Sequence, residues 1–543
     1  MRKLPGLALS CCLILAAIKA AHATPPAPHG GGLFTTAPPE RTDAAAPAHE
    51  PRRLCGPPAD GSPNWECSNW AGTVKWTPSA VVAPATEAEL ASYLRAEAAA
   101  AAAAAPGAPP RAPLKVVGFA HSWAGLYVPA AAPGGARGAT LALHMLSGIT
   151  QLNATHAEVL AGTSFAALFE ELHSKGLGLA WHPGGIQGLT VGGAVAVGFH
   201  GSQMSLGGVS SVVSALRLYD TDGVPHDLTD DASPDAMRAA RMGLGMCGVV
   251  ARVTLPVVPQ FHLRRRRWRT DDLGAFFGEE LPRLKSTYDR FHWYLHPLSE
   301  SAWPMYWEPA TAEESLAEGR PCRTAAEQAE DALLTEFGPD GLPLIMRWDN
   351  CSDVSHLSLT HAVDMEQQPL WNGEYYVSLD TASEAAATRE ILRRFDAVAA
   401  RRGGPGARPP RDLWLHVRYV GADTSALLNP CYYSEEGAVC AAFELAIVAP
   451  AMDAPLPPWD EWADYFGAME DVLRALGGRP HHAKYTSESA GPPAVPGFGL
   501  PVREFRKQCA AFDPHRLMRN EVFDRVYGGL QPAEEGEVAV AVS

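Results

Sequence analysis

The sequence predicts an α+β protein in two main parts, because the pattern of its apolar residues changes near residue 260. From 64 to 260, short apolar runs alternate with helical segments and glycine-rich turns, as expected of a mixed domain. From 261 to 500, alternating aromatic and β-branched runs predict an antiparallel sheet covered by helices on one face. Residues 501–530 are expected to return to the first domain, and 531–543 to form a tail.

The elements of the first domain can be placed in order. A capped helix is predicted at 86–95, running into an alanine tract that ends at Pro106. Next come an apolar strand at 115–119, a strand near 140–146, a helix at 164–175 and a glycine-rich passage, 182–208. A strand at 212–219, a helix at 234–242 and a glycine turn entering a strand at 245–255 complete this part.

The second domain is predicted from longer apolar runs. Strands are expected at 291–295, 374–379 and 413–420, helices at 383–401 and 458–476, and a final helix and turn within 502–525. The basic run 264–269 directly follows an apolar, strand-like run. We interpret it as a solvated edge strand or a domain crossover.

The composition excludes some partners. The 543 residues include 47% hydrophobic and 19% charged residues, enough to bury a sizeable core. Lys+Arg 44 against Asp+Glu 60 gives a net charge of −16, which argues against nucleic acid. Nothing firm indicates a membrane or a protein partner.

The N-terminus has the form of a targeting segment. Two basic residues precede an apolar stretch at 7–18, and Ala21-His22-Ala23 has the small-x-small form of a cleavage site. We therefore expect a signal peptide at 1–23, a flexible Pro/Ala-rich leader at 24–63, and a secreted or lumenal protein. Organelle targeting or an N-terminal membrane anchor is the alternative.

The cysteines and two Asn-x-Ser/Thr triplets agree with that compartment. Eight cysteines remain after the leader, an even number that permits disulfides, although sequence cannot fix their pairing. Cys55 with Cys67, and Cys431 with Cys440, are close enough to close local loops. The triplets at 153–155 and 350–352 have the form of glycosylation acceptors.

Two stretches carry the candidate chemistry. The first, 115–123, reads Lys-Val-Val-Gly-Phe-Ala-His-Ser-Trp, a buried strand that breaks into a tight turn whose amides could face an anion. The second, 183–202, holds seven glycines in twenty residues without the pattern of either common nucleotide-binding loop. Its apolar residues argue against a linker, and backbone passing close to a bound dinucleotide would explain it.

These stretches, with the turn at 243–250, resemble in order the FAD-binding domain of vanillyl-alcohol-oxidase-type (PCMH) flavoproteins. The segment 477–484, Gly-Gly-Arg-Pro-His-His-Ala-Lys, is similar to the G-G-R-P-H-W-G-K segment of the sugar-1,4-lactone oxidase group and related alditol oxidases. The segment 512–520 resembles the closing D-P-x-x-x-F-x-N element of that group. The resemblance spans about 65 to 526.

The resemblance implies a set of site residues. His121 is the expected covalent attachment point for FAD, the backbone at 118–123 would hold the pyrophosphate, and His481 and Lys484 match a histidine and a lysine near the flavin ring. The implied cofactor residues are Gly118, Phe119, Ala120, His121, Ser122, Trp123, Gly188, Thr190, Gly192, Gly193, Gly198, His200, Gly201, Ser202, Gly248, Val249, Val250 and His481. No metal is expected.

One position departs from the family pattern. The strand that usually reads V-E-x-R-F corresponds to 415–419 here, so Arg418 matches while His416 replaces the glutamate. An imidazole can donate, accept or act as a base, so His416 is a candidate site residue. Its alternative role is to pair with a neighbour in the sheet.

The resemblance implies oxidation of a sugar-type alcohol, with hydride transfer to flavin N5 and oxygen as the expected acceptor. The expected substrate is an aldono-1,4-lactone, as in the last step of ascorbate synthesis. Lys484 and Arg418 would orient substrate oxygens, and His416 or His481 would accept the proton. The alternatives are an alditol or carbohydrate oxidase, or a secreted glycoprotein that binds flavin or carbohydrate without catalysis.

Overall fold

The computed structural model describes residues 55–56, 65–104, 113–129, 137–181, 184, 188–322, 350–359, 369–435, 437–449, 456–486 and 499–527. The predicted signal peptide, nearly all of the leader, the tail, and residues 182–183 and 185–187 of the glycine-rich passage lie outside these ranges. Within the ranges, no helix has the length and apolarity needed to cross a membrane.

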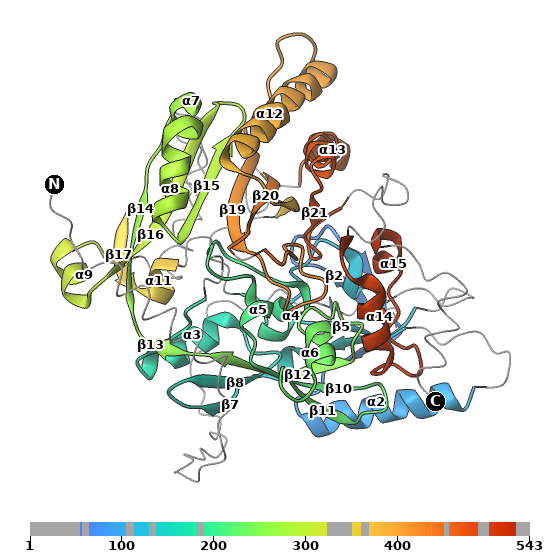
Figure 1. Cartoon of the computed structure of the whole chain (residues 1–543). Helices are drawn as coiled ribbons and strands as arrows, with labels where there is room; N and C mark the ends of the chain where they lie inside the picture. Colours follow the sequence, from blue (N-terminus) through green and yellow to red (C-terminus); the bar gives the residue numbers. More distant parts are fainter. Residues whose placement is uncertain are drawn as a thin grey trace.

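The first domain combines small sheets with helices (Figure 1). A five-stranded antiparallel sheet has the order β11-β10-β12-β8-β7, and a three-stranded parallel sheet the order β4-β6-β5. Their strands are β4 (Val81–Val82), β5 (Lys115–Val117), β6 (Thr140–Ala142), β7 (Ile149–Leu152), β8 (His156–Leu160), β10 (Ala215–Tyr219), β11 (Pro225–Thr229) and β12 (Val249–Pro256). The helices are α2 (Glu87–Ala102), α3 (Phe165–Ser174), α4 (Val191–Val197), α5 (Val209–Val212) and α6 (Pro234–Ala240).

Several predicted elements of this domain are confirmed and others are corrected. Helix α2 begins where expected, because the side chain of Thr86 accepts a hydrogen bond from the Glu89 N–H. Strand β6 is shorter than predicted, since residues 143–145 form a 3₁₀ turn. The glycine-rich passage contains one short helix, α4, and a second, α5, begins directly after it; glycine content alone did not predict either.

Two further small sheets lie before the first domain's main sheets in the sequence and at its junction with the second domain. Strands β1 (Cys55–Gly56), β2 (Glu66–Ser68) and β3 (Lys75–Trp76) form one, and β9 (Leu177–Gly178) pairs with β13 (Val258–Pro259) in the other. Disulfides join Cys55 to Cys67, Cys247 to Cys509, Cys322 to Cys351, and Cys431 to Cys440. The two loop closures considered from sequence are therefore both present.

The second domain is an eight-stranded antiparallel sheet in the order β17-β14-β16-β15-β19-β20-β18-β21 (Figure 1). Its strands are β14 (His262–Arg267), β15 (Arg290–His296), β16 (Ser301–Ala310), β17 (Cys351–Val354), β18 (Leu370–Val377), β19 (Leu413–Gly421), β20 (Val439–Val448) and β21 (Arg479–Pro480). The helices are α7 (Leu273–Ala275), a π-helical turn (Phe276–Glu280), α8 (Leu281–Thr287), α9 (Ala312–Glu318), α11 (Ser355–Leu359), α12 (Thr381–Gly403) and α13 (Trp459–Ala475).

Alternation along the central strands gives the sheet two different faces. On β19, Leu413, Leu415, Val417 and Tyr419 belong to a core shared with residues of α8, α12 and α13. Because successive side chains point to opposite faces, the intervening residues, including His416 and Arg418, lie on the other face. Strands β15, β18 and β20 follow the same rule, so the polar residues of all four strands share one face.

The basic run forms β14, and the prediction of an edge strand is wrong. Strand β14 pairs with β16 on one side and β17 on the other. Ion pairs to Glu308 and Glu318 neutralise Arg264, so this charge can lie within a sheet.

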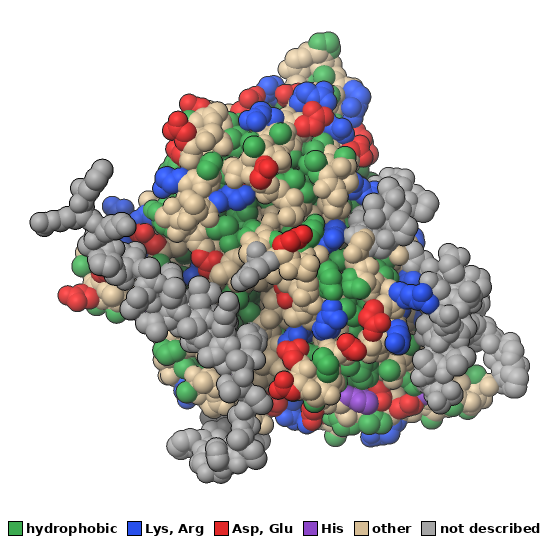
Figure 2. Space-filling model, in the orientation of Figure 1, with side chains coloured by type: hydrophobic (Ala, Val, Ile, Leu, Met, Phe, Trp, Pro, Cys, Tyr) green, Lys and Arg blue, Asp and Glu red, His purple; other side chains and the backbone are tan. Residues whose placement is uncertain are grey.

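On the face shown in Figure 2, acidic and basic side chains are interspersed rather than gathered by sign.

The C-terminal segment forms two helices, α14 (Val502–Ala510) and α15 (Glu521–Tyr527), where one helix and a turn were predicted. Both pack into the hydrophobic core of the first domain, through Phe505 and Phe523 among others. The Leu114 N–H also donates to the Leu517 carbonyl, and the Lys115 ammonium donates to the Met518 carbonyl at 2.9 Å. The chain therefore returns to its first domain before it ends.

Candidate active site

A pocket opens in the first domain where β5 ends, and residues 118–123 form part of its wall. Ala120 has a φ of 53°, in the left-handed region, which turns the backbone sharply. Within the described part of the chain, the amides of Phe119, Ala120, His121 and Ser122 find no protein acceptor. Successive free amides around a left-handed residue make a concave anion site, which fits the pyrophosphate of FAD.

Glycines let the backbone close around the same pocket. A Cβ added to Gly118 would lie 2.1 Å from Thr190 Oγ1, and one added to Gly192 would lie 2.6 Å from the Ala161 Cβ. Thr190 caps α4 by accepting a hydrogen bond from the Gly193 N–H. The start of α4 can line the pocket only because side chains are absent here. The pocket thus has backbone amides at one end and apolar residues or glycines along its walls. This combination suits a dinucleotide that carries a flat ring.

His121 faces this pocket from the turn at 118–123, which is called the pyrophosphate turn below. Its ring stacks on Trp70, with centroids 5.4 Å apart and planes 19° from parallel. Burial, and then the charge of Lys484, lower the pKa of His121 to about 4. The imidazole is therefore neutral at pH 7, with a lone pair available for bond formation.

The segment 481–484 is fixed against the same turn. The Trp123 N–H donates to the Ala483 carbonyl at 2.7 Å, and the Trp123 indole N–H donates to the Leu370 carbonyl at 2.8 Å. The Lys484 ammonium lies 4.4 Å from the centroid of the Trp123 ring, as in a cation–π contact. Lys484, His481 and His121 consequently all line one pocket.

Four buried charges of alternating sign run from the sheet to that lysine. Arg418 lies 2.7 Å from Glu374 on β18 and 3.0 Å from Glu444 on β20, and Lys484 lies 3.0 Å from Glu444. Burial opposes ionisation of Glu444, yet Arg418 and Lys484 hold its pKa well below the usual range. Each cation therefore has a carboxylate partner, as buried charges require.

His416 belongs to this network through both ring nitrogens. Nδ1 lies 3.1 Å from Glu444, Nε2 lies 3.1 Å from His292 Nδ1, and the ring stacks on Tyr294 at 3.8 Å. Because an ionised carboxylate only accepts, Nδ1 carries the hydrogen and Nε2 accepts one from His292. Burial lowers the pKa of His416 to about 4. Its lone pair is therefore occupied, which does not favour the predicted role as proton acceptor.

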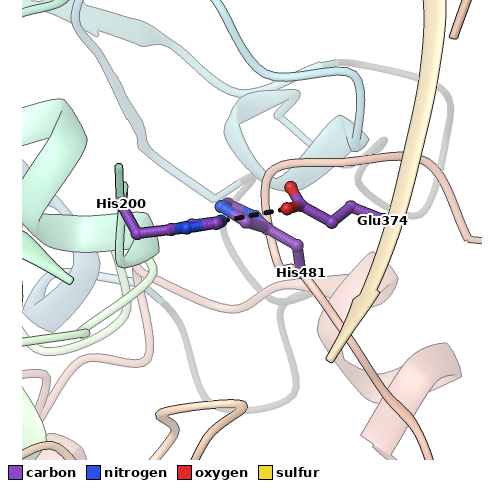
Figure 3. Close-up of side chains that lie close together, drawn as sticks. All are labelled: His200, Glu374 and His481. Atoms are coloured by element: carbon purple, nitrogen blue, oxygen red, sulfur yellow. Dashed lines mark hydrogen bonds and ion pairs between the residues drawn. The ribbon is translucent and has the colours of Figure 1, made fainter. Parts of the chain in front are cut away.

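His481, which lines the pocket, lies close to His200 and Glu374, which do not line it (Figure 3). His481 Nδ1 accepts the Ala483 N–H at 3.0 Å, so Nε2 carries the hydrogen and His481 is a donor rather than a base. His200 Nε2 lies 3.0 Å from the same Glu374 oxygen that Arg418 contacts. The three side chains are spaced like metal ligands, but the hydrogen on His481 and the arginine on Glu374 oppose a cation.

The other predicted cofactor residues divide into two groups. Thr190, Gly192, Gly193, Gly248 and Val250 line the pocket together with 118–123 and His481. Gly198 ends α4 in the left-handed conformation, and Ser202 accepts the Tyr419 N–H, tying the first domain to the sheet. The residues that do not line the pocket are Gly188, Gly198, His200, Gly201, Ser202 and Val249.

Sequence reasoning missed the two carboxylates. Glu374 and Glu444 are 0% and 7% exposed, and Glu444 interrupts an apolar run, Ala-Ala-Phe-Glu-Leu-Ala at 441–446. A charge inside such a strand was the available signal, because buried charges occur where a partner is supplied. Trp70, which stacks on His121, gave no comparable signal.

Comparison with known proteins agrees with this geometry. Residues 78–229 match the FAD binding domain model, and 253–526 match the D-arabinono-1,4-lactone oxidase model. L-gulonolactone oxidase of Mus musculus is 27% identical over 342 residues, covering 60% of this chain and 71% of that protein. L-gulono-1,4-lactone dehydrogenase of Mycobacterium tuberculosis is 26% identical over 482 residues, covering 86% of this chain and all of that protein.

The fold is similar to a solved structure as well. Cholesterol oxidase from B. sterolicum superposes with a TM-score of 0.64 at 17% identity, covering 89% of this chain and 100% of that one. This likeness, with the match at 78–229, confirms the predicted α+β fold with a PCMH-type FAD-binding domain. Since the lactone oxidase model spans half of the sequence, the chain belongs to the D-arabinono-1,4-lactone oxidase family and is an FAD-dependent oxidoreductase.

Proposed function

We propose that this enzyme oxidises a secondary alcohol of an aldono-1,4-lactone, with oxygen as the electron acceptor. The observation that carries the proposal is the position of Lys484, which lines the FAD pocket beside His121 and is paired to the polar face of the sheet through Glu444. FAD, when bound, supplies the hydride acceptor. The names of the relatives, gulonolactone oxidase and gulono-1,4-lactone dehydrogenase, support the substrate class.

Lys484 in the pocket lining, with Arg418 and Glu444 joined to it by ion pairs, is suited to a substrate rich in hydroxyl groups. The ammonium of Lys484 offers three N–H donors and the guanidinium of Arg418 five, and Glu444 accepts. Lys484 and Arg418 would orient substrate oxygens and stabilise negative charge as the C–H bond breaks. His481 would add a donor through Nε2–H. The hydroxyl proton would leave to solvent, because the ring nitrogens of His416 and Nδ1 of His481 already have partners.

We further propose that FAD is attached through His121. The neutral imidazole, held against Trp70, is the nucleophile that the flavin pocket presents at the pyrophosphate turn. We also retain secretion through the N-terminal segment as a proposal, supported by the four disulfides of the described chain.

A substrate panel tests the proposed reaction. The purified holoenzyme would be supplied with aldono-1,4-lactones, alditols and free sugars in air, and hydrogen peroxide would be measured. We expect lactones to give the highest kcat/KM and stoichiometric peroxide. Turnover of alditols alone would instead favour an alditol oxidase, and turnover only with an artificial dye would favour a dehydrogenase.

A further inference from the structure

Lys484, which lines the pocket, belongs to a balanced group of four charges. Lys484 and Arg418 contribute two positive charges, and Glu374 and Glu444 two negative charges, in one chain of contacts between 2.7 and 3.0 Å. Arg418, Glu374 and Glu444 lie behind Lys484 in this group. Because Glu444 neutralises Lys484, the group presents hydrogen-bonding atoms to the pocket without a surplus of either sign.

The neighbouring histidines do not change this balance at neutral pH. Burial lowers the pKa of His416 and of His121 to about 4 and that of His481 well below its ordinary value. Burial, followed by the charge of Arg418, also lowers the pKa of His200. His121, His416 and His481, the histidines nearest to Lys484 and Glu444, are consequently neutral around pH 7. His200 contacts Glu374 and the Gly201 carbonyl instead.

A pocket whose lining lysine belongs to such a balanced group discriminates between two forms of one sugar derivative. An uncharged lactone or polyol can exchange its hydrogen bonds with water for bonds to these donors and acceptors. A carboxylate would have to lose its hydration next to cations that are already neutralised, which costs far more than burying a hydroxyl group. The same cations would bind a carboxylate well if one of the two glutamates were neutral.

Of the two glutamates, Glu444 is the one whose position can decide whether the pocket binds a lactone or a carboxylate. Its side chain is 10% exposed and contacts Lys484 and Arg418, whereas the Glu374 side chain is fully buried against Arg418 and His200. Glu444 also receives the Asn372 amide at 2.5 Å and the His416 Nδ1–H at 3.1 Å, so its position is fixed from four sides.

We propose that Glu444 is a specificity-determining residue that makes the site select an uncharged polyhydroxylated substrate over the corresponding open-chain sugar acid. This inference rests on the proposed lactone oxidation. It assigns to Glu444 the exclusion of anions, separately from any effect on the rate of the chemical step.

The test compares the binding of a lactone with that of its aldonate. Dissociation constants would be measured at pH 7 with anaerobic holoenzyme. For L-gulonate the method is equilibrium dialysis of the radiolabelled ligand. For L-gulono-1,4-lactone it is the protection that the ligand gives against thermal unfolding. In Glu444→Gln, the ratio of aldonate to lactone affinity should rise at least about tenfold. Glu390→Gln, which removes an exposed charge on α12, should leave the ratio unchanged.

A second pair of variants keeps the proposal falsifiable if Glu444→Gln does not fold. His416→Glu adds a negative charge directly across the strand pair, so it should lower the aldonate-to-lactone ratio. His416→Glu combined with Glu444→Gln restores the charge on the neighbouring strand and should return the ratio toward wild type. If Glu444 had only a structural role, the aldonate-to-lactone affinity ratio would not rise in Glu444→Gln and fall in His416→Glu.

The outcomes separate this inference from the proposed function. An unchanged ratio in both Glu444→Gln and His416→Glu, or equal wild-type affinity for lactone and aldonate, overturns the role of Glu444. A wild-type enzyme whose flavin is reduced by no lactone or polyol overturns the proposed function, and the ligand affinities remain measurable in that case.

Discussion

His416 and Glu444 lie directly opposite each other on β19 and β20, and His416 Nδ1 is 3.1 Å from the Glu444 carboxylate. The family pattern leads one to expect a carboxylate at position 416. In this chain the carboxylate stands one strand away and contacts Arg418 and Lys484 from there. A carboxylate and an arginine are therefore both present in the group of charges that includes Lys484, although the strand motif contains only the arginine.

Removing the ammonium of Lys484 should impair the chemical step. In Lys484→Met, the cation that faces the pocket is lost and Glu444 keeps only Arg418 as a charged partner. We expect kcat for the best lactone to fall by roughly 10²–10³, measured as the rate of anaerobic flavin bleaching. Lys175→Met, at an exposed position after α3, is the matched control and should behave as wild type. A Lys484→Met enzyme of normal rate would exclude this role.

His121 should determine whether flavin stays with the polypeptide. Acid precipitation of wild type should leave yellow fluorescence on the protein band, because His121 is the neutral nucleophile at the turn. His121→Ala should release the flavin under the same conditions, and the exposed His173→Ala should not. Retention of flavin by the His121→Ala polypeptide would show that the attachment is elsewhere.

Acid should destabilise the fold before the carboxylates titrate. His416 and His482 have pKa values lowered by burial to about 4, while unfolded histidine has a pKa of about 6.5. Between these values the unfolded state binds more protons, so stability falls as pH decreases from 6.5 to 4. Urea unfolding at pH 7 and pH 5 should show this loss.

Substitution of one such histidine should flatten that pH dependence. His482 donates through Nε2–H to the Leu428 carbonyl and accepts the Tyr527 hydroxyl hydrogen at Nδ1. In His482→Asn, the loss of unfolding free energy between pH 7 and pH 5 should be smaller by about 2 kcal/mol. The exposed His173→Asn serves as the control, and identical slopes in the two variants would contradict the assignment.

The structure distinguishes the two glycosylation triplets. Asn153 and Thr155 are exposed between β7 and β8. In the second triplet, by contrast, Cys351 is in a disulfide and Ser352 is 3% exposed. In a eukaryotic secretory host, Asn153→Gln should remove a glycan mass that Asn350→Gln leaves in place. A glycan on Asn350 would contradict this prediction.

The sequence predicted the parts of the site that lie in continuous motifs. The turn at 118–123 and the segment 481–484 were identified from their residues and from family resemblance, and they contact each other through Trp123 and Ala483. Glu374 and Glu444 were missed because their roles depend on strand order. Strands β18, β20 and β19 become neighbours only in the folded sheet, and one-dimensional spacing does not show which side chains face each other.

The same reason explains the error at β14. A run of arginines was expected at an edge, where water solvates the charge. In the fold, Glu308 comes from β16 and Glu318 from α9, and both pair with Arg264. Neither partner is close to the arginines in sequence, so the sequence showed the charges without the groups that neutralise them.

The most direct test of the account is the anaerobic addition of an aldono-1,4-lactone to the purified protein, followed by its visible spectrum. The protein should be yellow as isolated, and the lactone should bleach the flavin absorbance near 450 nm. Air should then restore the absorbance with release of hydrogen peroxide. A colourless protein, or a yellow one whose spectrum no lactone or polyol changes, would contradict the account.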